Sequence, residues 1–199
     1  MILSREVACA LLRHEEAGMH HQLKSISKAG IPEALAKVET YRYLNEPEEA
    51  ESICRDILAV DAENQLARRM LGLAITDQFS GAANDRYAEA QGLFQSLREA
   101  YERYYYMGLL NERRAKAQLH AGRSPHTLLP LIEEAMRCFA EAEKIRPGGN
   151  DDSILRWNRC ARLLESRPEF HAEHPGPHAF DAEDAPPANV SVRRTGSSR

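Results

Sequence analysis

Long hydrophobic runs are absent from this sequence of 199 residues. No stretch of about 18 consecutive apolar residues occurs, so we expect no membrane-spanning helix. The first apolar stretch is short, is interrupted by Arg5, Glu6 and Arg13, and has no basic leader before it, unlike a secretory signal peptide. These absences predict a cytoplasmic protein that does not bind a membrane.

Cysteine is also scarce, and none of the four cysteines forms a CxxC pair. Cys9, Cys54, Cys138 and Cys160 all lie within apolar patterns of helical period. This placement favours small buried side chains in a reducing compartment over a disulfide framework or a zinc site.

No charge of one sign dominates the chain. The net charge is −4, and the 26 Lys and Arg residues are scattered rather than gathered into a basic patch. A nucleic-acid-binding surface needs such a patch, so we expect no nucleic-acid partner. A hydrophobic content of 43% is enough for one packed domain of moderate size.

Strand patterns are missing, and good helix formers take their place. Apolar and polar residues do not alternate, whereas Ala, Leu, Glu and Arg dominate up to about residue 165. The sequence therefore predicts an all-α protein of about eight helices. The expected helical ranges are 4–29, 31–45, 48–60, 65–79, 86–121, 125–146 and 151–166, with one break inside 86–121 that the pattern does not place.

Three regions follow from this division. Residues 1–30 hold an amphipathic N-terminal helix, in which Met19, Leu23 and Ile26 share one face, and Gly30 is the expected stop. Residues 31–166 form the main helical domain. Residues 167–199 are rich in Pro, His and small residues and carry too little apolar surface to offset their ordering entropy, so we expect a disordered tail.

A spaced motif in the helix at 125–146 indicates how the helices pack. Ala135, Phe139 and Ala142 share one face, and Pro147 cannot continue the helix. Alanines let two helix backbones approach closely, while the phenylalanine fills the space beside them. The same slots recur earlier in the chain as Ala50, Cys54 and Ile57, and as Ala90, Phe94 and Leu97.

This motif resembles the second helix of a tetratricopeptide repeat (TPR), a family whose unit of about 34 residues pairs two helices. The first helices match in part, with Gly72 and Gly108 at the glycine slot, Val38 replacing glycine in the first unit, and Trp157 in a terminal first helix. The intervals between Gly72 and Ala90 and between Gly108 and Ala135 are longer than the family's. A generic antiparallel helical array, and one continuous helix between the second and third units, therefore remain alternatives.

The resemblance implies a right-handed α-solenoid whose first helices line a concave groove for a partner segment. Within the triple Tyr104–Tyr106, Tyr104 should then pack between helices while Tyr105 points toward the groove. By the family's register, the predicted partner-binding residues are Arg42, Tyr43, Arg69, Leu73, Tyr105, Leu109 and Arg113.

Motifs for catalysis and for metal binding fail. His14 and Glu15 begin an HExxH pattern, but Gly18 stands where the second histidine belongs. Glycine-rich phosphate loops and GxSxG are absent. We therefore expect a non-catalytic protein–protein interaction module, without cofactor or metal, that binds a protein or peptide. The alternatives are a homodimer formed through residues 4–29 and, less favoured, an enzyme or metalloprotein with a helical site at Glu16 and His20.

Overall fold

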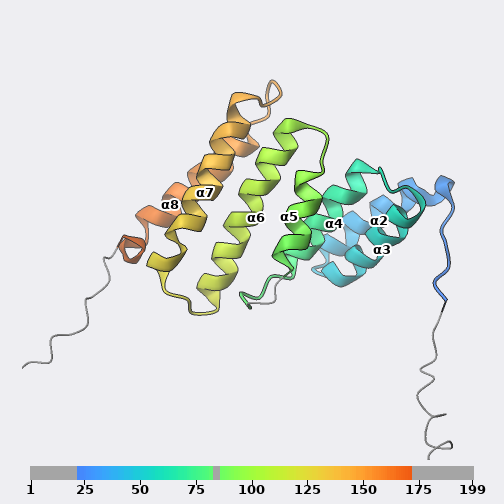
Figure 1. Cartoon of the computed structure of the whole chain (residues 1–199), viewed down its shortest axis with the longest axis horizontal. Helices are drawn as coiled ribbons and strands as arrows, with labels where there is room; N and C mark the ends of the chain where they lie inside the picture. The colour runs from blue at the N-terminus through green and yellow to red at the C-terminus, as the bar shows by residue number, and fades with distance from the viewer. Residues whose placement is uncertain (1–21, 83–85, 172–199) are drawn as a thin grey trace, which may run out of the picture.

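The computed structural model describes residues 22–82 and 86–171, and within these ranges all secondary structure is helical (Figure 1). The elements are η1 (Lys28–Gly30), α2 (Ile31–Tyr43), α3 (Pro47–Val60), α4 (Gln65–Asp77), α5 (Tyr87–Gln95), α6 (Ala100–His120), α7 (Pro125–Lys144), α8 (Asp152–Glu165) and η2 (Pro168–Phe170). The all-α prediction is confirmed, and the predicted ranges agree with these helices to within about two residues at most ends.

Proline and asparagine explain several helix boundaries. Proline occupies the first turn of α2, α3 and α7, where its missing N–H needs no partner. The side chain of Asn64 accepts a hydrogen bond of 3.0 Å from the Ala67 N–H and so caps α4. Asn45 adopts a left-handed conformation with φ of 61°, which lets the chain turn tightly from α2 into α3.

The break that the sequence left unplaced lies at Ser96–Glu99, between α5 and α6. The Arg103 guanidinium donates hydrogen bonds to the carbonyl oxygens of Leu97 and Arg98, at 2.7 and 2.6 Å. The Arg98 N–H in turn donates to the Gln65 side chain at 2.8 Å. These contacts satisfy backbone groups that have no partner where the helix is interrupted. Because α5 ends at Gln95 and α6 begins at Ala100, one continuous helix is ruled out here.

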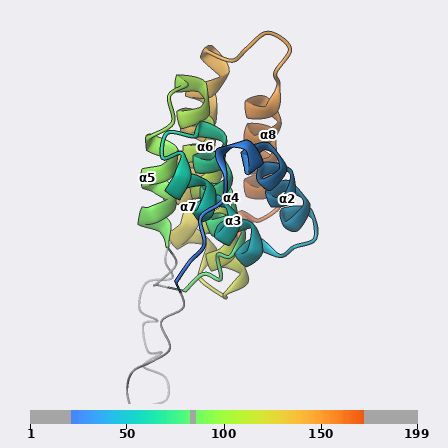
Figure 2. The ribbon, with the colours of Figure 1, turned by 90° about the vertical axis from the view of Figure 1, so that its right-hand side faces the viewer.

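The helices pack in chain order. Each helix contacts the next one, and α2 also contacts α4, α4 contacts α6, and α6 contacts α8. Figure 1 shows the helices following one another across the molecule, with the two ends of the described chain at opposite sides. Seen from the end in Figure 2, α2 and α8 lie on one side and α5 on the other.

The small residues of the repeated motif lie in the core, as the sequence predicts. Ala50, Ala90, Ala135 and Ala142 are all completely buried. Phe94 and Phe139 are buried as well, and each ring covers the backbone of a glycine on the preceding helix of its pair. A Cβ atom added at Gly72 would lie 2.5 Å from the Phe94 ring, and one added at Gly108 would lie 2.7 Å from the Phe139 ring. Glycine at these two positions therefore lets a phenylalanine fill the helix crossing.

The predicted N-terminal helix at 4–29 is wrong in the part that the structure describes. Residues 22–27 are not helical, and Lys28–Gly30 form a 3-10 turn, which the Ser27 hydroxyl caps by accepting a hydrogen bond of 3.1 Å from the Gly30 N–H. Gly30 precedes α2 rather than ending a helix, and Leu23 is 88% exposed. The rest of this prediction, residues 4–21, lies outside the described residues.

The predicted disordered tail begins too early at residue 167. Pro168–Phe170 form a 3-10 turn that contacts α7 and α8, and Phe170 is almost fully buried. A single aromatic ring therefore anchors these residues to the end of the domain, which the composition of the segment did not reveal. Residues 172–199 lie outside the described part of the chain.

The three cysteines that the structure describes, Cys54, Cys138 and Cys160, are buried and free, as expected. Burial raises the pKa of the Cys54 and Cys160 thiols to about 12 and that of Cys138 to about 11. These thiols therefore stay protonated and inert at neutral pH. Cys9 lies outside the described residues. Across 22–82 and 86–171, none of the helices combines the length and the apolar character that crossing a membrane requires.

Candidate interaction surface on α2, α4, α6 and α8

A row of charged side chains connects the alternate helices α2, α4 and α6. Arg42 on α2 pairs with Asp77 on α4, at 2.7 Å between Nε and Oδ2, and Arg113 on α6 pairs with the same carboxylate. Arg113 also donates hydrogen bonds to the Thr76 hydroxyl at 2.5 Å and to the Leu73 carbonyl at 3.2 Å. Burial lowers the pKa of Arg113, while the nearby Asp77 carboxylate opposes this effect by favouring the charged form of the guanidinium. The row fixes three helices relative to one another.

A buried carboxylate extends the row to α8. Glu112 on α6 is completely buried, with Lys116 one turn away and the Arg156 guanidinium of α8 3.5 Å from its Oε2 atom. Taking an unpaired carboxylate out of water is costly, and these two cations offset the cost of burying the Glu112 side chain.

Tyrosines from α6 cluster beside the row. The rings of Tyr101 and Tyr105 stack with centroids 5.8 Å apart, and Tyr105 meets Tyr106 edge-on at 5.1 Å. Tyr106 in turn stacks on Phe94 at 5.3 Å. The expected burial of Tyr104 is wrong, because Tyr104 is 44% exposed and its two successors turn inward instead.

A cleft of about 320 Å³ opens next to these tyrosines, where the N-terminal ends of α4, α6 and α8 meet. It is lined by Arg69, Glu99, Tyr101, Glu102, Tyr105, Tyr106, Pro147, Asn150 and Asp152. Arg69 pairs with Glu102 at 2.6 Å, and its guanidinium lies 6.0 Å from the centre of the Tyr106 ring. The Tyr101 hydroxyl and the Asn150 side-chain oxygen are 3.1 Å apart in a hydrogen bond that ties α6 to the turn before α8.

A second, smaller hollow lies between α2 and α4. It measures about 210 Å³ and is lined by Glu39, Arg42, Tyr43 and Met70. Tyr43 is 90% exposed, which makes it one of the most exposed large side chains among the described residues.

The seven predicted site residues therefore occupy three environments. Arg42, Arg69 and Arg113 belong to the ion pairs, and Tyr43 and Tyr105 line the two hollows. Leu73 and Leu109 are only 8% and 3% exposed, so they offer a partner little surface and support the core instead. Sequence reasoning missed Glu99, Tyr101 and Asp152, which come from helix starts that the motif register did not use.

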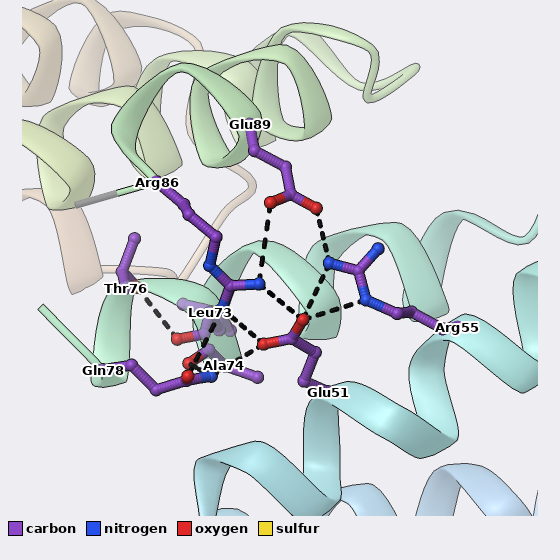
Figure 3. A network of polar contacts seen from close by, with 8 residues as sticks. All are labelled: Glu51, Arg55, Leu73, Ala74, Thr76, Gln78, Arg86 and Glu89. Atoms are coloured by element: carbon purple, nitrogen blue, oxygen red, sulfur yellow. Dashed lines mark hydrogen bonds and ion pairs between the residues drawn. The ribbon is translucent and has the colours of Figure 1, made fainter. Parts of the chain in front are cut away.

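A separate polar network, shown in Figure 3, joins α3 to the start of α5. Glu51 accepts hydrogen bonds from Arg86 at 2.5 and 2.6 Å, from Arg55 at 2.7 Å and from Gln78 at 2.8 Å, and Arg55 also pairs with Glu89 at 2.6 Å. The Arg86 hydrogen bonds lower the pKa of Glu51 to about 2, against the opposing effect of burial. Because every charged member is paired within the chain, we assign this network a structural role.

Metal binding finds no support in the described ranges, where no group of three or more His, Cys, Asp or Glu side chains could hold an ion. The weak candidates Glu16 and His20 lie outside those ranges. No protein-family model matches the chain, and no curated protein or solved structure is detectably similar to it.

Proposed function

We propose that the chain is a TPR-like helical-repeat protein that binds a segment of a partner protein along α2, α4, α6 and α8 and acts as an adaptor or assembly factor without catalysis. Three regularities support the repeat. Alternate helices contact one another, glycine–phenylalanine crossings recur in two successive helix pairs, and ion pairs join residues about one unit apart. The pairs Arg42–Asp77 and Arg69–Glu102 are separated by 35 and 33 residues.

The cleft between α4, α6 and α8 is the observation that carries the binding proposal. Clefts of several hundred Å³ with aromatic walls and a few polar groups are the usual form of binding sites. Here three tyrosines line the cleft, and aromatic residues are among the side chains that contribute most to interface affinity. The exposed Tyr43 extends the same surface to α2.

Ion pairs across the surface are a second observation that supports the proposal. Arg42, Asp77 and Arg113 are held by one another, and Arg69 is held by Glu102 and Tyr106. A surface whose side chains are already ordered loses less conformational entropy when a partner docks. Such a site selects its partner without first having to fold around it.

Two aromatic substitutions test the proposal. A partner captured with the full-length chain and then purified should bind the Tyr43→Ala/Tyr101→Leu variant at least about tenfold more weakly than the wild type, by calorimetric titration. Tyr104→Ala is the matched control, since it removes an exposed tyrosine that lines neither hollow, and it should leave the affinity unchanged. Circular dichroism establishes that both variants are folded. Equal affinity of all three proteins would refute binding at this surface.

A further inference from the structure

We infer that the cleft between α4, α6 and α8 accepts a lysine or arginine side chain of the partner segment. This inference rests on the proposed function and specifies the chemistry of its ligand. It starts from the charges around the cleft, which do not balance. One cation, Arg69, faces three carboxylates, those of Glu99, Glu102 and Asp152, so the formal charge of the lining is −2.

The excess negative charge belongs to two particular side chains. Arg69 neutralises Glu102 through its 2.6 Å ion pair. Glu99 and Asp152 make no ion pair among the described residues, and both are exposed. They come from different elements, Glu99 from the residue before α6 and Asp152 from the first residue of α8. A cation bound in the cleft would therefore be attracted by carboxylates from two different elements.

The aromatic part of the cleft lining suits the rest of a basic side chain. Tyr101 and Tyr105 stack with ring planes only 14° apart and form an aromatic surface beside the cleft. Lysine and arginine lay their methylene stems along such surfaces, and their charged groups are also attracted to aromatic faces. Arg69 already makes this kind of contact with Tyr106, at 6.0 Å, within the same cleft.

A simpler role exists for the two acidic residues, and the experiment has to separate it from ligand binding. Carboxylates near a helix N-terminus stabilise the helix itself. That role explains each of the two residues alone, but it does not explain why they share a tyrosine-lined cleft. It predicts a change in thermal stability without any change in ligand preference.

Selection from a library of random peptides displayed on phage, with the full-length chain as bait, tests the inference. We expect the selected peptides to be enriched in Lys or Arg at one position. A synthetic selected peptide should bind the Glu99→Gln/Asp152→Asn variant at least about threefold more weakly than the wild type. Replacing its basic residue by norleucine, which keeps the stem and removes the charge, should weaken binding to the wild type and abolish the difference between the two proteins.

The matched control is Glu46→Gln/Glu49→Gln, which removes two exposed carboxylates from the start of α3, away from the cleft. This control should bind the peptide as the wild type does. Selected peptides without basic residues, or peptides that bind the wild type and the Glu99→Gln/Asp152→Asn variant equally, would overturn the inference and leave peptide binding standing. If no peptide sequence is enriched, the proposed function fails together with the inference.

Discussion

Gly72 and Gly108 are the helical residues against whose backbone a phenylalanine of the next helix lies. Each faces a buried phenylalanine ring on the second helix of its pair, so the side-chain volume that one helix lacks is supplied by the other. In the first pair the corresponding slots hold Val38 and Cys54, both completely buried, with a larger side chain on the first helix and a smaller one on the second. The volume at the crossing is thus divided differently in different pairs.

The surroundings of three helical glycines predict opposite effects of their substitution by alanine. Gly72→Ala and Gly108→Ala should each destabilise the domain by about 1–3 kcal/mol, because the new methyl group overlaps a buried ring that cannot move freely. Gly92→Ala in α5 should instead stabilise it by about 0.5–1 kcal/mol, since no atom outside the adjoining residues and the helix's own backbone lies within 4 Å of the added Cβ, and alanine is the better helix former. Urea unfolding measures all three, and destabilisation by Gly92→Ala would contradict the packing argument.

Glu51 is the residue whose charge should contribute most clearly to stability. Its pKa in the folded protein is about 2, compared with about 4.5 for an unperturbed glutamate, and its side chain is only 13% exposed. A carboxyl group with a lowered pKa stabilises the fold above its unfolded-state pKa. That contribution is lost as the pH falls through the interval from about 4.5 to about 2.

The Glu51→Gln variant isolates this contribution. At pH 7 it should be less stable than the wild type by roughly 2 kcal/mol, and the difference should shrink toward zero between pH 4.5 and pH 2. Chemical unfolding of both proteins across this range measures the difference, in which the titration of all other groups cancels. A difference that stays constant with pH would mean that the Arg86 contacts do not depend on the charge of Glu51.

At the scale of the helices, most boundaries follow from local chemistry and could be predicted. Proline in the first turn indicates where α2, α3 and α7 begin, and the Asn64 cap indicates where α4 begins. The break at Ser96–Glu99 could not be placed, because it contains neither proline nor glycine and is held by Arg103 and Gln65 from outside the break. Local patterns do not encode such long-range hydrogen bonds.

The two ends of the domain illustrate the same limit. Residues 22–27 carry a helical spacing of apolar residues but are not helical, since helix propensity without a packed face is too weak to decide conformation. Phe170 lies in a segment whose composition predicts disorder, yet one buried ring is enough to hold the turn against α7 and α8. Average composition does not register a single strong contact.

At the scale of the whole molecule, charge pairs reveal a period that the motif search did not use. Arg42–Asp77, Arg55–Glu89 and Arg69–Glu102 are separated by 35, 34 and 33 residues. A search for opposite charges about 34 residues apart would have found these pairs in the sequence. It would also have shown that the predicted arginines form ion pairs within the chain. Glu99 and Asp152, which form none among the described residues, are therefore better candidates for contacting a partner.

A chain whose helices contact only those one or two places away in the sequence should also unfold locally. Extensive contacts in the described residues join helices adjacent in the chain or next but one, and none connects α2 or α3 with α7 or α8. Val38→Ala, which removes buried apolar volume from α2, should cost about 2 kcal/mol within the first helix pair. Because repeat arrays transmit stability through nearest neighbours, amides of α2 and α3 should exchange about tenfold faster or more, while those of α7 and α8 change little.

Hydrogen exchange followed by mass spectrometry measures this gradient, and a substitution at the other end supplies the control. Phe139→Leu in α7 should produce the reverse pattern, with faster exchange in α6, α7 and α8 and little change in α2. The two gradients must have opposite directions, because each variant weakens the contacts of its own end. Equal acceleration of all helices by either variant would instead indicate a single cooperative bundle, in which case the repeat interpretation and the extended binding surface built on it would both have to be abandoned.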